Sequence, residues 1–357
     1  MPRAARCRKA ISLGNRSIGL NSSALKLSAV IPTYNRRTHV LRAIDSVLAQ
    51  TAPVDEIIVV DDGSTDGTSD AIRNRFGGRV AVLGQKNSGV SAARNHGIRE
   101  ARGEWIALLD SDDVWLPTKI ERQLEALATF GDEFGVCFTD CVYEGHPDIK
   151  LSNFEATGFG DAPTFGVLES PAQCILEERE PFCTPSFLIR RSLFDEIDCF
   201  DEAAVIKEDT DVIFRLGFKT RFCFVSEKLV CMDRTISRTD GLSEICVTRD
   251  DRKYRSMIRV YSKWLSLPEV RGSEYERPVR DTLTAVYFDS VEAKIHELKL
   301  TAALREVRGL RQLGKGYVSI IATLLSRKLA KVRRRFKRSI ATAATEGVVN
   351  GATGINP

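Results

Sequence analysis

The feature that most constrains the fold of this chain is a repeat of short apolar runs and amphipathic segments between residues 27 and 113. Segments with helical spacing of their apolar residues, such as 90–101, separate the runs. The runs are residues 27–31, 57–60, 80–83 and 105–109. Strands that alternate with helices of about 10 to 15 residues form right-handed crossovers and a mainly parallel sheet. The repeat therefore predicts an α/β domain in which helices flank the sheet.

Composition and charge exclude some classes of protein. The 357 residues include 52 basic and 48 acidic side chains, and the net charge of +4 is too small to indicate nucleic acid as the main partner. The longest apolar stretches are far shorter than the roughly 20 residues that a membrane-spanning helix needs. We therefore expect a cytoplasmic protein. The nine cysteines are scattered, and we expect them to be reduced and to hold no zinc.

Three carboxylates, Asp110, Asp112 and Asp113, directly follow the fourth apolar run. In sheets of this kind ligands bind beyond the carboxyl ends of the strands, and the loops after the first two runs also carry polar groups. Crowded carboxylates repel one another, and a divalent cation relieves the repulsion. The cluster therefore predicts a site for Mg²⁺ or Mn²⁺, with a solvated Asp-rich loop as the alternative.

A second acidic group, Glu208 and Asp209, begins a predicted helix over residues 209–218. One interpretation is structural: Asp209 stabilises the helix N-terminus, and Asp211 pairs with Arg215 four residues later. The other is catalytic, because a carboxylate in a partly desolvated cleft can remove a proton from an attacking hydroxyl. The residues themselves leave both interpretations open.

Five motifs in order strongly resemble family 2 glycosyltransferases over residues 27–238, about 60% of the chain. They are Val30-Ile31-Pro32-Thr33-Tyr34-Asn35, Val59-Val60-Asp61-Asp62-Gly63-Ser64-Thr65-Asp66, Asn87-Ser88-Gly89-Val90-Ser91-Ala92-Ala93-Arg94-Asn95, Leu109-Asp110-Ser111-Asp112-Asp113 and Glu208-Asp209. Each motif alone is weak, but five in this order, each at a predicted strand or helix end, are specific. The resemblance implies a GT-A fold, with a Rossmann-like, mainly parallel sheet flanked by helices and a C-terminal helical extension.

The resemblance also implies an inverting, metal-dependent transfer of sugar from a nucleotide diphosphate to an acceptor hydroxyl. Asp209 would be the general base, with Glu208 beside it. Asp112 and Asp113 would bind the Mg²⁺ or Mn²⁺ ion at the diphosphate. The nucleotide sugar would be held by Pro32, Tyr34, Asp61, Asp62, Arg94, Asp110 and Ser111. The acceptor would be a saccharide or a lipid-linked sugar of polysaccharide or glycoconjugate biosynthesis.

The expected organisation follows from these assignments. Residues 1–26 carry basic but no acidic side chains, which suits a disordered leader, and the pattern after residue 240 predicts charged helices. The expected parts are a leader (1–26), a catalytic domain (27–240) with a nucleotide-sugar-binding half (27–130) and an acceptor half (131–240), a basic helical extension (241–340) and a disordered tail (341–357).

The sequence departs from the family at two places. Cys199 stands where family members often have glycine, and the stretch from Cys231 to Thr235 lacks a histidine that they often carry. The missing imidazole puts a donor contact in doubt, although Arg234 or Arg238 could supply positive charge to a phosphate. Neither departure touches the acid cluster or the proposed base.

Several alternatives remain open in the sequence. A GT-A domain could bind a nucleotide sugar without turnover, and a nucleotidyltransferase also combines a doubly wound sheet with acidic metal ligands. Trp115 either packs in the core or stacks on a substrate. Residues 317–338 pass from apolar to strongly basic, and they form either a solvated helix or a peripheral contact with the inner face of the plasma membrane.

Overall fold

The computed structural model describes residues 25–145, 151–234 and 250–327. Residues 1–24 of the predicted leader and the whole predicted tail lie outside these ranges. Contacts divide the chain into two compact units, with the boundary between Val279 and Arg280. The first unit holds the sheet, and the second holds helices; each is described by itself.

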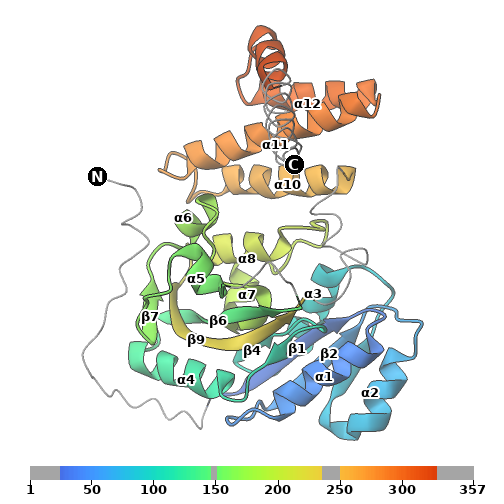
Figure 1. Cartoon of the computed structure of the whole chain (residues 1–357), viewed down its shortest axis with the longest axis vertical. Coiled ribbons are helices and arrows are strands. Elements are labelled where there is room, and N and C mark those ends of the chain that lie inside the picture. The colour runs from blue at the N-terminus through green and yellow to red at the C-terminus, as the bar shows by residue number, and fades with distance from the viewer. Residues whose placement is uncertain (1–24, 146–150, 235–249, 328–357) are drawn as a thin grey trace, which may run out of the picture. The chain divides into compact units, whose positions relative to one another are not determined.

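The first four strands of the sheet are parallel, as the repeat predicted. The middle residues of β1 pair with both neighbouring strands, so that Ala29 lies opposite Ile57 on one side and Ala107 on the other. Three helices connect the strands (Figure 1). The elements are β1 (Leu27–Thr33), α1 (Arg37–Leu48), β2 (Glu56–Asp61), α2 (Thr68–Phe76), a short 3₁₀ turn (Gly77–Arg79), β3 (Ala81–Gly84), α3 (Val90–Glu100) and β4 (Trp105–Leu108).

The two faces of these strands bury alternate residues, because successive side chains of a strand point to opposite faces. Ala29 and Ile31 share one core cluster with α1. Val30 and Val60 face α3 instead, where a Cβ built on Gly97 would come within 2.5 Å of Val30 Cγ1. The glycine therefore lets α3 lie directly on the sheet, which fixes the position of the residues that precede it on the same helix.

The second part of the sheet is mixed rather than parallel. The strand order is β3-β2-β1-β4-β8-β6-β9-β5, with β7 paired to β9. β8 is antiparallel to both β4 and β6, whereas β6 and β9 run parallel to each other. The added elements are β5 (Val114–Trp115), α4 (Lys119–Phe130), β6 (Phe134–Glu144), α5 (Asn153–Thr157), β7 (Phe165–Leu168), α6 (Pro171–Leu176), a 3₁₀ turn (Thr184–Ser186), β8 (Leu188–Arg190), α7 (Ser192–Glu196), α8 (Glu208–Leu216) and β9 (Arg221–Asp233).

Helix α10 (Asp251–Ser266) packs on α8 within the first unit. The indole of Trp264 stacks on Phe214 with 3.8 Å between ring centroids, and its Nε1 donates to Asp211 Oδ1 over 2.9 Å. Asp211 also pairs with Arg215 over 2.7 Å, as the structural interpretation of this helix predicted. The first helix after residue 241 that the structure describes therefore belongs to the first unit, where it completes the burial of α8.

Trp115 belongs to the core. Its side chain is 2% exposed, and its Nε1 donates to the carbonyl oxygen of Pro185 over 2.9 Å. The ammonium of Lys119 lies 4.2 Å from the centre of the indole ring. These contacts exclude the alternative in which the indole stacks on a substrate.

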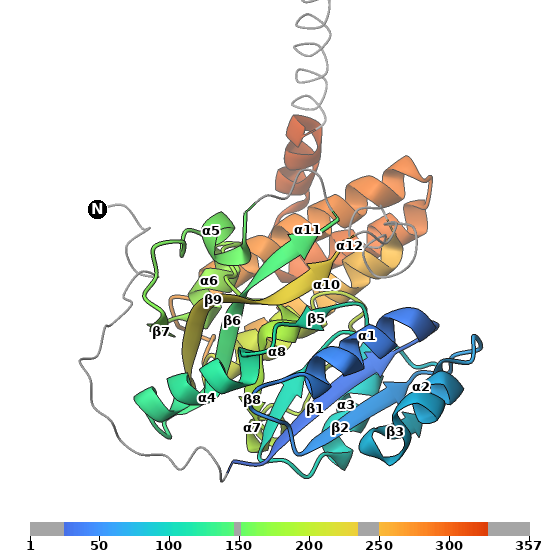
Figure 2. The same cartoon turned by 60° about the horizontal axis from the view of Figure 1, so that its bottom comes forward.

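The second unit is built from α11 (Glu276–His296), which begins just before the boundary, α12 (Leu300–Gln312) and a helix over residues 317–327. A small core of Phe288, Val291, Leu310 and Ile320 joins them. Figure 2 gives a turned view in which α11 and α12 are drawn in orange. Among the residues that the structure describes, none of the helices combines the length and apolarity that crossing a bilayer requires.

Candidate active site

A cavity of about 600 Å³ opens beyond the carboxyl ends of β1, β2 and β4. This volume suits a ligand of the size of a small cofactor or drug. Residues from the first turn of α8 and from the end of β9 complete its lining. Sequence-predicted residues in the lining are Pro32, Tyr34, Asp62, Arg94, Asp110, Ser111, Asp112, Asp113, Glu208 and Asp209.

The loops after β1 and β2 are fastened to each other at the cavity rim. Asn35 accepts from the backbone N–H of Thr65, and its own N–H donates to Ser64 Oγ, both over 2.8 Å. Asn35 adopts a left-handed backbone with φ of 49°, a conformation that asparagine tolerates better than most residues. The linked loops leave Tyr34 47% exposed, so that its ring is free to stack on a ligand.

Two adjacent carboxylates at the end of β2, Asp61 and Asp62, have different positions. Asp62 lines the cavity, and its oxygens accept from the backbone N–H groups of Ser88 and Gly89 over 2.8 Å, which fixes the start of α3. Asp61 lies outside the lining; its carboxylate accepts from the backbone of Ser64 and the hydroxyl of Ser69. Asp61 therefore holds the loop, and the structure does not bring it to the cavity with the other predicted residues.

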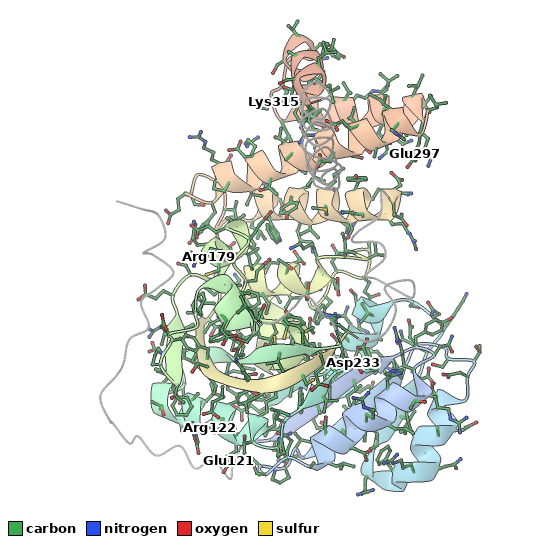
Figure 3. All side chains as sticks on the ribbon, viewed as in Figure 1. Glu121, Arg122, Arg179, Asp233, Glu297 and Lys315 are labelled. Atoms are coloured by element: carbon green, nitrogen blue, oxygen red, sulfur yellow. The ribbon has the colours of Figure 1, made fainter. Side chains whose placement is uncertain are left out.

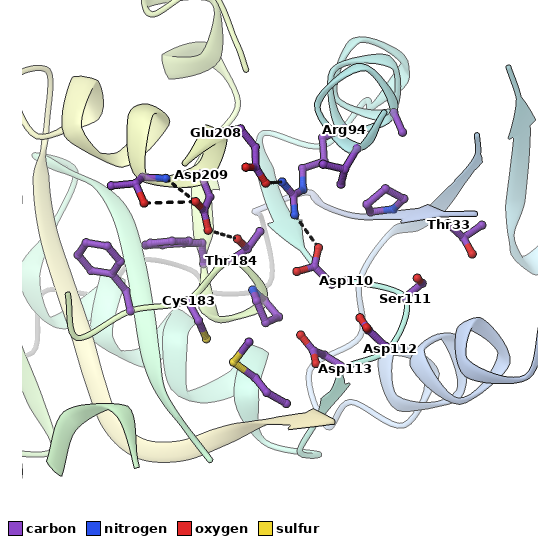
Figure 4. Close-up of a pocket in the computed structure, with 18 of the residues that line it drawn as sticks. Thr33, Arg94, Asp110, Ser111, Asp112, Asp113, Cys183, Thr184, Glu208 and Asp209 are labelled. Carbon is purple, nitrogen blue, oxygen red and sulfur yellow. Dashed lines mark hydrogen bonds and ion pairs between the residues drawn. The ribbon is translucent and has the colours of Figure 1, made fainter. Parts of the chain in front are cut away.

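The acid cluster lies on one wall of the cavity (Figure 4). Burial, followed by the charge of Asp110, raises the pKa of Asp112. The pKa of Asp113 lies well above its ordinary value because of burial, Asp110 and Asp112. Asp113 Oδ1 also accepts from the backbone N–H of Asp233 over 3.2 Å, at the end of β9 where Figure 3 labels that residue. Burial and mutual repulsion thus both disfavour the charged forms of Asp112 and Asp113.

Arg94 connects the acid cluster to the N-terminus of α8. Its guanidinium is almost fully buried and lies 2.7 Å from Asp110 Oδ1 and 3.1 Å from Glu208 Oε1. Burial opposes the charge, but Asp110 and Glu208 together raise the pKa of Arg94 above its ordinary value. The residue expected to sit near the nucleotide thus also ties the two halves of the cavity together.

Asp209 faces the acid cluster across the cavity (Figure 4). Thr184 Oγ1 donates to Asp209 Oδ2 over 3.0 Å, and the N–H of Thr210 donates to Asp209 Oδ1 over 2.6 Å. Asp209 lies in the first turn of α8, where the helix dipole stabilises a carboxylate. Its orientation is therefore fixed from two sides, with the carboxylate in the same cavity as Asp112.

The side chain of Glu208 points toward Arg94 rather than toward Asp209. Burial raises the pKa of Glu208 to about 7, the charge of Asp209 adds to the shift, and Arg94 opposes it. The ion pair does not restore an ordinary acidity, because burial and Asp209 together outweigh the attraction of Arg94. Glu208 consequently changes charge close to neutral pH.

Comparison with known proteins shows which family this part of the chain matches. Residues 28–198 match the family model described as glycosyl transferase family 2. This part of the chain is a family 2 glycosyltransferase domain.

An uncharacterised glycosyltransferase of Nostoc sp. is 34% identical over 179 residues, which are 48% of this chain and 53% of that protein. The succinoglycan biosynthesis protein ExoO of Rhizobium meliloti is 35% identical over 182 residues, 50% of this chain and 52% of that protein. The chain thus spans about half the length of these relatives.

The fold of the glycosyltransferase domain is shared with a solved structure. S. aureus TarS, residues 1–349 in complex with UDP-GlcNAc, aligns with a TM-score of 0.57 at 18% sequence identity, covering 82% of this chain and 93% of that chain. The predicted GT-A fold is confirmed. Its mainly parallel character holds for β1 to β4, and the rest of the sheet is mixed.

The acid cluster of the glycosyltransferase domain suits a hard divalent cation. Within the described residues, no three His, Cys, Asp or Glu side chains are arranged as a complete metal site. Asp112 and Asp113 offer only carboxylate oxygens, and Mg²⁺ commonly takes its remaining ligands from phosphates and water. Burial and, after it, the neighbouring carboxylates raise the pKa of both residues, and a bound cation would oppose that shift.

The structure shows where the two positions lie at which the sequence departs from the family. Cys199 adopts a left-handed backbone with φ of 52°, a conformation that favours glycine. Arg234 lines the cavity at the position left without histidine, and its charge opposes the raised pKa of Asp112 and of Asp113. Arg238 lies outside the described residues.

Other lining residues carry no signal that the sequence alone reveals. Thr184 precedes β8 in a 3₁₀ turn, and Lys207 precedes α8 with a left-handed φ of 63°. Both come from the irregular middle of the chain, where no strand-end pattern marks them. The unpredicted polar and aromatic lining residues include Arg36, Tyr143, Asn153, Glu180, Phe182, Thr184 and Lys207.

Proposed function

We propose that this chain is an inverting glycosyltransferase that moves a sugar from a nucleotide diphosphate carrier to an acceptor hydroxyl, in polysaccharide or glycoconjugate biosynthesis. The observation that carries the proposal is the shared cavity, in which Asp112 and Asp113 face Asp209. A cation site and a base on opposite walls leave room between them for a sugar that is attacked on one side and released on the other.

Asp209 is the proposed general base. The acceptor oxygen forms a bond to the anomeric carbon, the bond from that carbon to the diphosphate oxygen breaks, and the hydroxyl proton passes to Asp209. A single displacement of this kind inverts the anomeric carbon. Thr184 keeps one carboxylate oxygen of Asp209 in place through its 3.0 Å hydrogen bond. Glu208, held by Arg94, acts through the position of α8.

Positive charge on the donor side would stabilise the departing nucleoside diphosphate. Asp112 and Asp113 would hold Mg²⁺ or Mn²⁺, which when bound acts as a Lewis acid at the diphosphate. Arg36 and Arg234 line the same part of the cavity and both oppose the raised pKa of Asp112. They are the proposed partners for phosphate oxygens.

The donor is proposed to be a nucleotide diphosphate sugar. Pro32, Tyr34 and Asp62 would hold the base and ribose, while Asp110 and Ser111 would approach the ribose. The UDP-GlcNAc complex of TarS, which shares the fold, supports this class of donor. The acceptor is proposed to be a saccharide or a lipid-linked sugar, in line with the name of ExoO, and reached from the cytoplasm at the inner face of the plasma membrane.

The experiment that tests the function is a panel of UDP-, GDP- and dTDP-sugars incubated with Mn²⁺ and the full chain. We expect release of nucleoside diphosphate from one nucleotide class, and loss of that release on chelation. Release of pyrophosphate in a parallel assay with nucleoside triphosphates and sugar 1-phosphates, without release of nucleoside diphosphate from the panel, would indicate a nucleotidyltransferase. Tight binding of a donor without release, in the presence of saccharide and lipid-linked acceptors, would indicate a binding module and overturn the proposal.

A further inference from the structure

The helix over residues 317–327 has apolar side chains on two sides. Ile320 is 2% exposed and belongs to the core of the second unit. On the outer side, Val318 is 83% exposed, Ile321 57% and Leu325 58%. Residues spaced by three, four and seven positions lie on the same side of a helix. These three residues, with Tyr317 before them, form what is called here the outer apolar face.

The exposed side of α12 continues this face with basic residues. Leu300 and Leu304 are about 60% exposed (59% and 61%), and the exposed Arg308 and Arg311 follow at the same helical spacing. Arg311 Nη1 donates to the hydroxyl of Tyr317 over 3.2 Å, and its guanidinium lies 4.4 Å from the centre of the tyrosine ring. Figure 3 labels Glu297 and Lys315, which lie just beyond the two ends of α12.

The charge of this surface is positive. Between residues 299 and 338 the sequence has one acidic residue, Glu306, and its carboxylate pairs with Lys294 over 3.1 Å. Two further acids of the unit, Asp289 and Glu292, both accept from Arg327. Directly after the described helix the sequence continues with Lys328, Lys331, Arg333, Arg334, Arg335, Lys337 and Arg338.

We propose that the outer apolar face and the basic side of α12 dock on an anionic lipid surface, with the helix lying in the membrane interface. Exposed apolar side chains, a tyrosine with an amphipathic ring and a cluster of cations are the features that bind helices at such interfaces. Within the described residues, no helix has the length and apolarity that spanning the bilayer requires. This inference rests on the proposed function in one respect: an acceptor at the membrane gives the chain a reason to bind there. The binding itself does not require the glycosyl transfer reaction.

A second copy of the chain fits this surface less well. A two-fold interface places the same patch on both partners, and the Arg308 and Arg311 side chains of the two copies would then face one another. Like charges at an interface are unfavourable. An anionic lipid headgroup layer instead supplies the opposite charge across the whole surface, and the acyl region accepts Val318 and Ile321.

Vesicle co-sedimentation of the full chain, without donor or acceptor, tests the proposal. We expect binding to phosphatidylglycerol-containing vesicles, little binding to pure phosphatidylcholine, and weaker binding when NaCl is raised from about 0.1 M to about 0.5 M. Val318→Glu combined with Ile321→Glu should weaken binding by at least about tenfold. Leu151→Glu is the matched control, because Leu151 is 55% exposed in the other unit, and it should bind as wild type.

The outcomes separate the possible occupants of the surface. Equal binding of the double variant and wild type, or no preference for anionic vesicles, would overturn the proposal. A doubled mass in light scattering that the double variant abolishes, without vesicle binding, would assign the surface to a second copy. Donor binding by the double variant checks that the catalytic unit is folded, and a failed transfer assay leaves the vesicle result unaffected.

Discussion

Thr184 shows how one side chain outside every recognisable motif can control the proposed base. Its hydroxyl is a donor to Asp209 Oδ2, and a hydrogen bond to a charged group contributes about 1.5 to 3 kcal/mol. Thr184→Val keeps the shape and removes the donor. We expect kcat to fall by roughly ten- to a hundredfold, with the donor KM unchanged.

The conservative change Thr184→Ser restores a hydroxyl and should recover most of the lost rate in the same steady-state assay. A parallel loss of donor affinity in Thr184→Val would mean that the threonine shapes the cavity rather than orienting Asp209. Unchanged kcat would remove Thr184 from the mechanism.

Glu208 gives the molecule a pH dependence of stability. Its pKa rises from an ordinary 4.5 to about 7 in the folded chain, chiefly through burial, so the folded state holds the proton more tightly than the unfolded state. The resulting stabilisation is complete below about pH 4.5 and is lost as the pH rises through about 7. Relative to Glu208→Gln, the wild-type free energy of unfolding should therefore fall by about 1 to 3 kcal/mol over this range.

Urea denaturation of both proteins at pH 5 and pH 8, in metal-free buffer, measures this difference. The glutamine variant cannot change charge at this position and removes the Glu208 contribution, while both proteins keep every other titrating group. A constant difference in unfolding free energy between the two pH values would show that burial does not shift the Glu208 carboxyl.

At the scale of elements, the turn between α7 and α8 contains a non-glycine residue in an unfavourable conformation. Cys199 has a φ of 52°, and its carbonyl oxygen accepts from Arg215 Nη2 over 2.8 Å. Glycine adopts this conformation without the steric cost of a Cβ and keeps the carbonyl. Cys199→Gly should therefore stabilise the fold by about 0.5 to 1 kcal/mol, measured by the urea midpoint.

The matched control for this change is Glu196→Gly, three residues earlier. Glu196 is exposed and ends α7, where glycine lowers helix stability by about 0.5 to 1 kcal/mol. Opposite signs for the two substitutions are expected. A loss of stability in Cys199→Gly would mean that contacts of the thiol outweigh the backbone cost.

The elements around the first half of the cavity were predictable from sequence because each apolar run ends at a polar loop. Asp62 and Asp112 follow β2 and β4 closely, and parallel strands bring such loops to one edge. β5, with two residues, has no periodicity to detect, and the antiparallel β8 depends on pairing with strands distant in sequence. The residues that line the second half of the cavity could therefore be identified only from the structure.

Individual roles were less predictable than positions. The Asp61-Asp62 pair looks equivalent in sequence, but only Asp62 reaches the cavity, because adjacent residues at a strand end point to opposite faces. Arg94 was expected near the nucleotide, and nothing in its motif shows that it also contacts Glu208, 114 residues away. Such contacts depend on how the second half of the sheet closes over the first.

At the scale of the whole molecule, the chain separates the proposed chemistry from the proposed docking surface. The cavity lies entirely in the first unit, and the exposed apolar and basic residues of α12 and 317–327 lie in the second. The two functions can therefore be removed independently: the Val318 and Ile321 changes should leave donor binding intact, and changes in the cavity should leave vesicle binding intact.

The central claim is that a cation site and a base act from opposite walls of one cavity. Calorimetry of nucleoside diphosphate binding with Mn²⁺, combined with a transfer assay, tests it on two variants. Asp209→Asn should bind the nucleotide within about twofold of wild type and lose roughly 10² to 10⁴ of the transfer rate. Asp112→Asn should lose the Mn²⁺-dependent part of nucleotide binding. Wild-type turnover by Asp209→Asn, or Mn²⁺-dependent binding unchanged in Asp112→Asn, would contradict the account.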